Sequence, residues 1–270
     1  ALPIFPSLLF HHMSQIQLSS SMIYSYGVVI LSGLFIVTIV SVLMGKLLGY
    51  SPDSWSSILQ GAARHNAFIA LAIAGSLFGD EGLAIGAVFM LLYVPSINIV
   101  VISIMVSNLK QPEQADTSQG IVNIFIELIK NPFILAMIAG LFVSLIESDK
   151  LIIVYETSSL LGSAALPIML LTIGAKIKVR DLALKITPIV ISNSLKLIVF
   201  PLIAYFVATF LGLSQLELVV AVIFASVPTA ASSHALAKQF GGDEQLMTSI
   251  VTTQVALSFI TIPVILAFII

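Results

Sequence analysis

Two short polar runs interrupt long apolar stretches of the sequence. Their members are Arg64, His65 and Asn66 within 57–79, and Pro228, Thr229, Ser232 and Ser233 within 216–240. Guanidinium, imidazole, amide and hydroxyl groups donate hydrogen bonds and can hold a carboxylate. Proline interrupts a helix, and a helix that restarts after a break presents the positive end of its dipole. The two runs therefore predict an anion-binding site where two helices are broken.

A single lysine inside an apolar stretch is a further candidate. Lys196 lies about ten residues into the stretch 186–212, which places it roughly 15 Å deep at a rise of 1.5 Å per residue. Its amine can neutralise a bound anion. Alternatively, the aliphatic part of the side chain can extend toward the membrane surface, so that the amine contacts the lipid headgroups. All 13 acidic residues lie in loops or near the ends of apolar stretches. An anionic substrate therefore fits better than a cation exchanged at buried aspartates.

Other kinds of chemistry find little support in the sequence. It has no cysteine, which excludes disulfides and thiolate metal sites. His11 and His12 are adjacent, so they point to different faces of a helix, and no acid lies near them. No nucleophile, base and acid stand together at membrane depth. We expect no metal, no cofactor and no enzymatic activity.

Composition places these residues in a membrane. Of the 270 residues, 59% are hydrophobic and 9% are charged, whereas soluble domains carry about 25% charged residues. Apolar stretches of about 20 residues, the length that crosses a bilayer, recur along the chain. We expect an all-α membrane protein with nine transmembrane helices, at about 1–15, 22–48, 57–79, 82–107, 121–146, 157–176, 186–212, 216–240 and 245–270. The net charge of −2 gives no reason to expect nucleic acid as a partner.

Basic residues orient the helices, because lysine and arginine collect on the cytoplasmic side. The loop after 157–176 holds four basic residues and one acid, which are Lys176, Lys178, Arg180, Lys185 and Asp181. With this loop in the cytoplasm, alternation of the helices also places Lys46 and Lys110 inside. The C-terminus is then expected outside.

Two short motifs recur at a nearly constant offset. They are Ala-Leu-Pro-Ile at 1–4 and 165–168, and Phe-Gly-Asp-Glu, with one extra glycine in the second copy, at 78–81 and 240–244. Repeats over 1–108 and 121–270 predict an inverted repeat of five transmembrane helices, with the two discontinuous helices crossed near the membrane midplane. The first of ten helices is then missing before Ala1, by truncation or by a natural short start. The alternative is that both broken helices are merely kinked and pack through small polar residues.

Several segments resemble the auxin efflux carrier family in its short-loop bacterial form. They are Arg-His-Asn-Ala-Phe-Ile at 64–69 with Leu-Phe-Gly at 77–79, Asn-Pro-Phe-Ile-Leu at 131–135, Leu-Pro-Ile at 166–168 with Ile-Gly-Ala at 173–175, and Pro-Thr-Ala-Ala-Ser-Ser at 228–233 with Leu-Ala at 236–237. That family belongs with the bile acid/sodium symporter-like superfamily, in which two discontinuous helices cross at the substrate site. The resemblance implies that Asn66 and Pro228 mark the two crossovers.

The resemblance also implies a division into two domains. The scaffold domain would comprise 1–15 and 121–177, and the mobile transport domain 22–108 and 186–270. We expect a secondary transporter of small organic anions, malate-like or auxin-like, that works by alternating access at the crossing in a bacterial inner membrane. Plant members commonly have proline where this chain has His65, and their long cytosolic loop is absent here, which favours a small dicarboxylate.

The expected partners follow from this interpretation. They are the anionic substrate, a coupling ion (Na⁺ or H⁺), the lipid bilayer and a second copy of the chain bound through the scaffold domain. The alternative from another functional class is a ligand-gated channel or membrane sensor that retains the transporter fold. Such a protein would lack coupled transport.

Overall fold

Helices make up the described part of the chain. The computed structural model describes residues 4–16, 18–109, 126, 130–145, 151–176, 185–230 and 232–270. Its main helices are α1 (Ile4–Gln15), α2 (Ser20–Leu47), α3 (Pro52–Ala63), α4 (Ala67–Asn108), α6 (Pro132–Ser144), α7 (Ile152–Ser163), α8 (Ala165–Lys176), α9 (Ile186–Ser194), the π-helix η2 (Leu195–Val199), α10 (Phe200–Phe210), α11 (Gln215–Ser226), α12 (Ser232–Phe240) and α13 (Glu244–Ile269). No strand occurs in the described ranges, so the predicted all-α class is confirmed.

Several helical runs are long and apolar enough to cross a bilayer. Within the described ranges there are five, which are Ser20–Leu47, Pro52–Asn108, Ile152–Thr172, Ile186–Phe210 and Glu244–Ile269. The second run is 57 residues long, more than twice the roughly 20 residues that one crossing needs. It contains two predicted helices, which part within α4 at Gly79, where φ is 58° and ψ is −141°. Glycine adopts such a positive φ without the strain that a side chain would bring.

Parts of the sequence prediction lie outside the described ranges. The predicted helix 121–146 is described only at 126 and 130–145, where α6 lies, so the total of nine helices remains a prediction. The inverted repeat also remains one, since 1–3 of its first motif are not described. Lys110 and the loop residues 177–184, which carry Lys178, Arg180 and Asp181, lie outside the described ranges as well.

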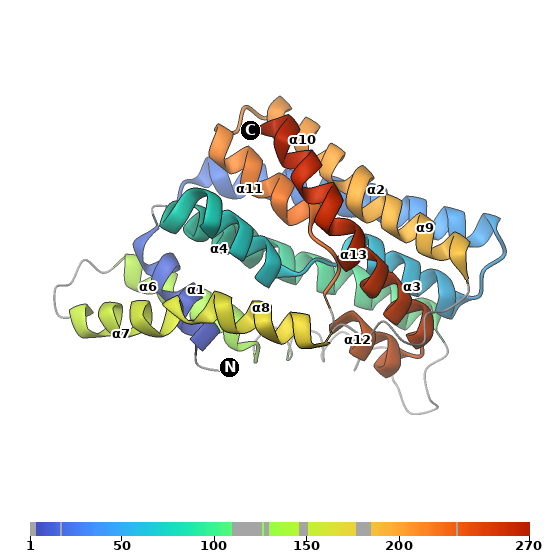
Figure 1. The fold of residues 1–270 in the computed structure, drawn as a ribbon, viewed down its shortest axis with the longest axis horizontal. Coiled ribbons are helices and arrows are strands. Elements are labelled where there is room, and N and C mark those ends of the chain that lie inside the picture. Colours follow the sequence, from blue (N-terminus) through green and yellow to red (C-terminus); the bar gives the residue numbers. More distant parts are fainter. Residues whose placement is uncertain are drawn as a thin grey trace.

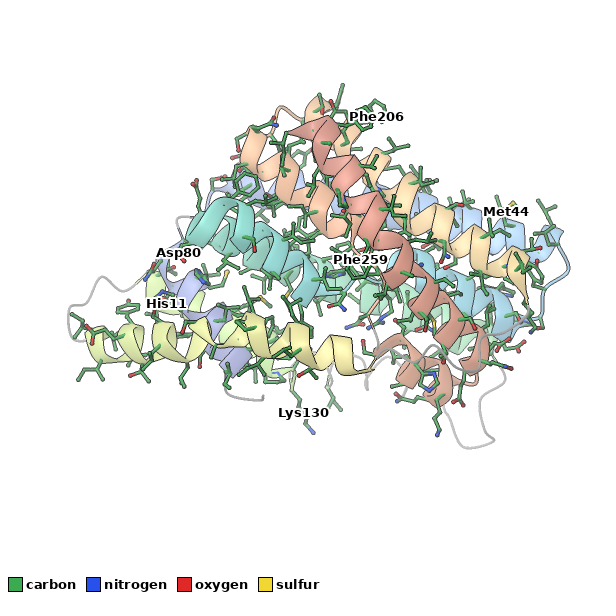
Figure 2. All side chains as sticks on the ribbon, in the orientation of Figure 1. His11, Met44, Asp80, Lys130, Phe206 and Phe259 are labelled. Carbon is green, nitrogen blue, oxygen red and sulfur yellow. The ribbon has the colours of Figure 1, made fainter. Side chains whose placement is uncertain are left out.

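Large apolar side chains cover the outer surface of the helices. Phe206 on α10 and Phe259 on α13 are 65% and 78% exposed (Figure 2). Many leucines and isoleucines on α2, α6 and α7 are exposed as well. A soluble monomer rarely shows contiguous apolar surface on this scale, whereas the hydrocarbon core of a bilayer suits it.

Helix α4 lies between two groups of helices (Figure 1). On one side it packs against α1, α6 and α8, and α1 in turn packs against α6 and α7. On the other side it packs against α2, α3 and α11, with α9, α10 and α13 packed onto these. The predicted scaffold and transport domains would meet along α4, and their division remains a prediction.

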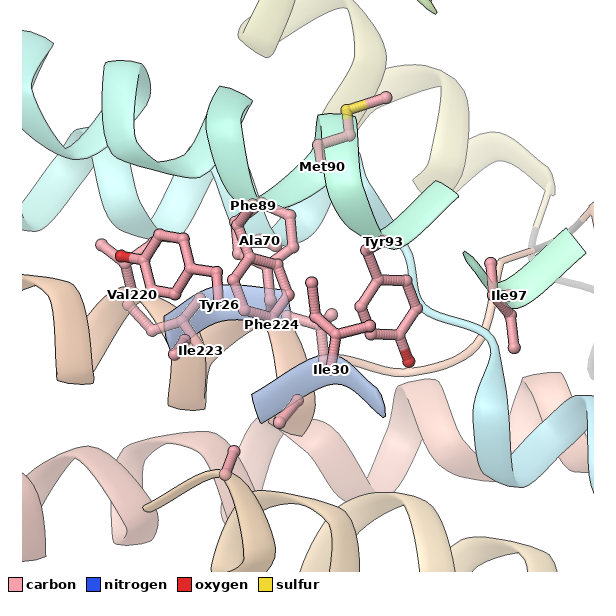
Figure 3. Close-up of a cluster of buried hydrophobic side chains, with 14 of the residues drawn as sticks. Tyr26, Ile30, Ala70, Phe89, Met90, Tyr93, Ile97, Val220, Ile223 and Phe224 are labelled. Atoms are coloured by element: carbon pink, nitrogen blue, oxygen red, sulfur yellow. The ribbon is translucent and has the colours of Figure 1, made fainter. Parts of the chain in front are cut away.

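Aromatic side chains fill the core between α2, α4 and α11 (Figure 3). Tyr26, Phe89 and Phe224 are each at most 1% exposed. The ring centroids of Tyr26 and Phe89 lie 5.2 Å apart, and those of Phe89 and Phe224 lie 4.9 Å apart. The Tyr26 hydroxyl donates to the carbonyl oxygen of Glu217 at 3.2 Å, so its polar end is satisfied. This core holds α4 against α11 close to the points where two helices are interrupted.

Candidate functional site

Both predicted helix breaks are present. The first separates α3 from α4 at residues 64–66, and the second separates α11 from α12 after Ser226. The two breaks touch, because the backbone N–H of Asn66 donates to the carbonyl oxygen of Pro228 at 2.8 Å. A backbone group freed by one break is therefore satisfied by the other, as a membrane interior requires. The candidate site is built around this contact.

The C-terminal end of α3 is closed by side chains from the second half of the chain. The Thr229 hydroxyl lies 3.2, 3.0 and 2.9 Å from the carbonyl oxygens of Gln60, Gly61 and Arg64, and its single hydrogen can be donated to one of them at a time. Gln254 on α13 accepts from the Thr229 N–H at 2.9 Å and donates to the Gly61 carbonyl at 3.0 Å. We call Thr229, Gln254 and these carbonyls the clasp. The clasp satisfies carbonyls that the end of a helix leaves without partners.

Asn66 closes the N-terminal end of α4. Its Oδ1 accepts from the N–H groups of Phe68 and Ile69 at 3.2 and 3.4 Å, which is the usual role of an N-cap asparagine. The dipole end that was expected to face a ligand is thus already occupied by the side chain's own oxygen. The Nδ2 group of Asn66 makes no hydrogen bond to the described residues, so it is the part of the side chain that can serve an anion.

The remaining candidates of the two polar runs have different surroundings. Arg64 is partly buried, and its Nη1 donates to Oδ1 of Asn98 on α4 at 3.2 Å. Ser232 is exposed at the start of α12, whereas Ser233 is buried and its hydroxyl has no hydrogen-bond partner among the described residues. Ser233 therefore offers an unused donor close to the second break.

His65 is buried in an aromatic environment. Its ring lies edge-on to Tyr93, with centroids 4.1 Å apart, and 5.6 Å from the ring of Phe224. Neither ring nitrogen has a hydrogen-bond partner among the described residues. Burying polar atoms in this way costs free energy, so the imidazole is an unused polar group beside the first break.

Lys196 is enclosed within the protein. It lies in the π-helix η2 and is 0% exposed, so its stem does not carry the amine to the surface as the snorkelling alternative requires. The amine has no hydrogen-bond partner among the described residues and stands 4.8 Å from the centroid of the Phe200 ring. Phe200 stacks on Tyr93 at 6.0 Å, and Tyr93 contacts His65. A row of rings thus connects the lysine to the first break.

Two contributors were not among the residues predicted from the sequence. Gln254 belongs to the clasp, and Asn98 holds Arg64. Each is an amide inside an apolar stretch, 82–107 or 245–270. Polar side chains at membrane depth are costly and usually have partners, so that rule would have found both. It would not have named the partners.

Comparison with known proteins identifies the family. A family model described as a membrane transport protein matches residues 3–266. The chain belongs to the auxin efflux carrier family. The match includes both helix breaks and Lys196. No curated protein matches the chain. Members of this family are membrane transporters rather than enzymes, so this member is a multi-pass membrane transporter.

No metal site accompanies these features in the described residues. They contain no group of three histidine, cysteine, aspartate or glutamate side chains that could hold an ion. His11 and His12 contact each other edge-on at 5.2 Å between ring centroids. The polar groups near the breaks are chiefly donors, and donors suit an anion better than a metal ion.

Proposed function

We propose that this transporter carries small organic anions, and that a substrate carboxylate binds beside the two helix breaks. The observation that carries the proposal is the Lys196 amine, which is 0% exposed and has no hydrogen-bond partner among the described residues. An ammonium group enclosed in this way needs a negative charge. A carboxylate supplies that charge each time it enters the site.

The other donors near the breaks give the carboxylate its contacts. We assign this role to the Nδ2 group of Asn66, the hydroxyls of Ser232 and Ser233, and the guanidinium of Arg64. His65 adds a ring that can donate or accept, depending on its tautomer. Thr229 and Pro228 shape the site through the clasp and through the backbone contact to Asn66.

Malate-like dicarboxylates are the favoured substrates, ahead of auxin-like aromatic acids. The mechanism is alternating access, in which 22–108 and 186–270 move as a transport domain against a scaffold of 1–15 and 121–177. A gradient of Na⁺ or H⁺ drives the cycle. The membrane is a bacterial inner membrane with the C-terminus outside, and a second copy of the chain binds through the apolar face of the scaffold.

Uptake by proteoliposomes tests the proposal. The purified protein is reconstituted, loaded with unlabelled malate and supplied with labelled malate outside. A carrier gives saturable counterflow. Unlabelled carboxylates added outside should inhibit this counterflow, whereas organic cations should not. An ohmic flux without saturation would instead support a ligand-gated channel, and binding without any flux would support a sensor.

A further inference from the structure

We propose that Lys196 carries a proton together with the substrate anion, being protonated when the anion is bound and neutral when the site is empty. This inference rests on the proposed function and names its coupling ion. The step is a proton transfer: the neutral amine takes up one proton as the carboxylate arrives and releases it when the carboxylate leaves. No bond to the substrate forms. A monoanion then crosses the membrane with no net charge, and a dianion crosses with one negative charge.

The described elements around Lys196 provide no permanent counter-charge to its amine. Helices α2, α3, α11 and α13 pack against η2, which continues from α9 into α10. The ionisable residues on or next to these elements are Tyr24, Tyr26 and Lys46 on α2, Tyr50 before α3, Asp53 on α3, Arg64 and His65 at the first break, Lys185 before α9, Tyr205 on α10, Glu217 on α11, Asp243 before α13 and Glu244 on α13. Three of the four carboxylates lie in the first turn of their helix, and the fourth, Asp243, caps α13 and pairs with Lys185. Among the described residues, none pairs with Lys196.

The nearest ionisable groups make the surroundings more positive. Arg64, a permanent cation, directly precedes His65 in the sequence, and Tyr93 lies between His65 and Phe200. The Phe200 ring can attract a desolvated ammonium by about 2 kcal/mol. That is less than the several kcal/mol by which a buried ion is penalised. An ammonium at Lys196 is therefore stable only while an anion is present.

The local backbone holds the amine in a defined place. A π-helix such as η2 is rare and occurs often at functional sites, and Pro201 directly after Phe200 cannot donate a helical hydrogen bond. Phe200 is pressed against α2 at Gly33, where an added Cβ would lie 2.0 Å from its ring. Because Phe200 cannot shift toward α2, the amine above its ring is confined to the interior.

Measuring exchange and net transport separately distinguishes this proposal from anion binding without proton transfer. Net transport requires the empty carrier to return across the membrane, whereas exchange does not. In the parent protein, an inwardly directed proton gradient should accelerate net uptake of labelled malate. Lys196→Arg keeps the charge that binds the anion but cannot release a proton. It should retain counterflow and lose proton-driven net uptake by about tenfold or more, which corresponds to a barrier about 1.4 kcal/mol higher.

Two further variants complete the design. Lys196→Met removes the charge and should lose both counterflow and net uptake. Lys238→Met removes an exposed lysine on α12 and should behave like the parent in both assays. Each variant is first shown to be folded by its gel-filtration profile in detergent. If Lys196→Arg fails to fold, a binding measurement on the parent protein replaces it. Calorimetry of malate binding in two buffers of different ionisation enthalpy should then show uptake of about one proton per anion.

The outcomes distinguish this inference from the proposed function. Proton-driven net uptake by Lys196→Arg at the parental rate would overturn the inference, as would binding without proton uptake. A third outcome would assign the proton to His65 instead. In that case a proton gradient would no longer accelerate net uptake by His65→Gln but would still accelerate net uptake by Lys196→Met. Saturable counterflow in the parent, together with net uptake that does not respond to a proton gradient, would leave the proposed function standing alone. Absence of saturable counterflow in the parent would remove the proposed function itself.

Discussion

Single residues at the two breaks divide into those already engaged and those still free to bind. Thr229 and Gln254 are engaged, because their polar groups satisfy the end of α3 and each other. Asn66 belongs to both groups. Its side-chain oxygen caps α4, whereas its Nδ2 group makes no hydrogen bond to the described residues. Lys196 and Ser233 are buried and unpaired among those residues. An unpaired buried polar group destabilises a protein by about 1–3 kcal/mol, and a ligand can recover that free energy.

The two roles of Asn66 can be separated by substitution. Asn66→Ser keeps a good N-cap oxygen but removes the amide donor, whereas Asn66→Ala removes both. We expect both variants to bind malate more weakly, by roughly tenfold or more, since one hydrogen bond to a charged group is lost, worth about 1.5–3 kcal/mol. Only the alanine variant should also lose about 1 kcal/mol of stability through the cap. Binding calorimetry and thermal unfolding in detergent measure the two effects. Parental affinity in the serine variant would place the carboxylate elsewhere.

At the scale of helices, close packing against α2 sets the position of the π-helix region. Gly33 on α2 faces Phe200, and a Cβ there would come within 2.0 Å of the ring, whereas a Cβ at Gly27 on the same helix would meet nothing within 4 Å. Gly61 is similarly tight, with the Ser192 oxygen 2.2 Å from a Cβ placed on it. Glycine at these two positions lets α3 and α10 approach their neighbours.

Gly33→Ala and Gly27→Ala form a matched pair of substitutions. Gly33→Ala should destabilise the protein by about 1–3 kcal/mol, because the Phe200 ring must move to make room. Gly27→Ala should be neutral or stabilise it by up to about 1 kcal/mol, since alanine favours the helix. The midpoints of thermal unfolding in the same detergent compare them. Equal midpoints would mean that Phe200 moves freely, and the confinement of the Lys196 amine would no longer follow.

A polar junction ties three helices together at the ends of the membrane-spanning segments, and its two charged residues, Lys185 and Asp243, lie outside those segments. Lys185, next to α9, donates to Oδ2 of Asp243 at 2.8 Å, and the other carboxylate oxygen caps α13 through the Leu246 N–H at 2.9 Å. Ser54 on α3 also donates to Asp243, at 3.3 Å. Burial alone would raise the pKa of Asp243, but the hydrogen bonds from Lys185 and Leu246 outweigh it and hold that pKa below its ordinary value of 3.8. The hydrogen bond to Asp243 raises the pKa of Lys185 above 10.5.

The signs of these shifts define a pH window for stability. Because the pKa of Asp243 is lower in the folded protein, its contribution is full above about pH 3.8 and is lost as pH falls through the folded value. The contribution of Lys185 is full below 10.5 and is lost as pH rises through its raised pKa. Asp243→Ala should destabilise the protein by about 1 kcal/mol at neutral pH through the lost cap.

Unfolding measured at several pH values tests this window. The difference between parent and Asp243→Ala should shrink as the solution is acidified below about pH 4. Glu244→Gln is the control, because the His234–Glu244 pair is 3.7 Å apart with both side chains nearly half exposed, and such pairs contribute less than about 1 kcal/mol. A difference between parent and Asp243→Ala that stayed constant down to pH 2 would contradict the assignment.

At the scale of the whole molecule, orientation in the membrane is the property most open to a direct test. The chain has no cysteine, so single introduced cysteines report one position each. Lys46 and Ile270 are both exposed. Ile270→Cys should react with a membrane-impermeant maleimide in intact cells, and Lys46→Cys only after the membrane is permeabilised, because basic ends of helices stay in the cytoplasm. The reverse pattern would invert the predicted orientation.

Hydropathy, the polar run at 64–66 and Pro228 are local properties, and they were sufficient to predict an all-α fold with apolar helices of membrane-spanning length and the two breaks. An apolar stretch of about 20 residues must be helical to satisfy its backbone in lipid. Pro228 and the run at 64–66 interrupt such stretches whatever surrounds them. The family was also recognisable from these short motifs. The kink at Gly79 was predicted only as the end of one helix and the start of another.

The partners of the polar groups were decided by tertiary structure alone. Thr229 reaches the carbonyl of Gly61 across 168 positions of sequence, and Gln254 reaches it across 193. The surroundings of Lys196 were also decided by tertiary structure. Its depth in the sequence was compatible both with an enclosed amine and with an amine that contacts the lipid headgroups. Hydropathy specifies how deep a residue lies but not which side of its helix faces another helix. That choice depends on which helices pack together, and here it enclosed the amine over Phe200.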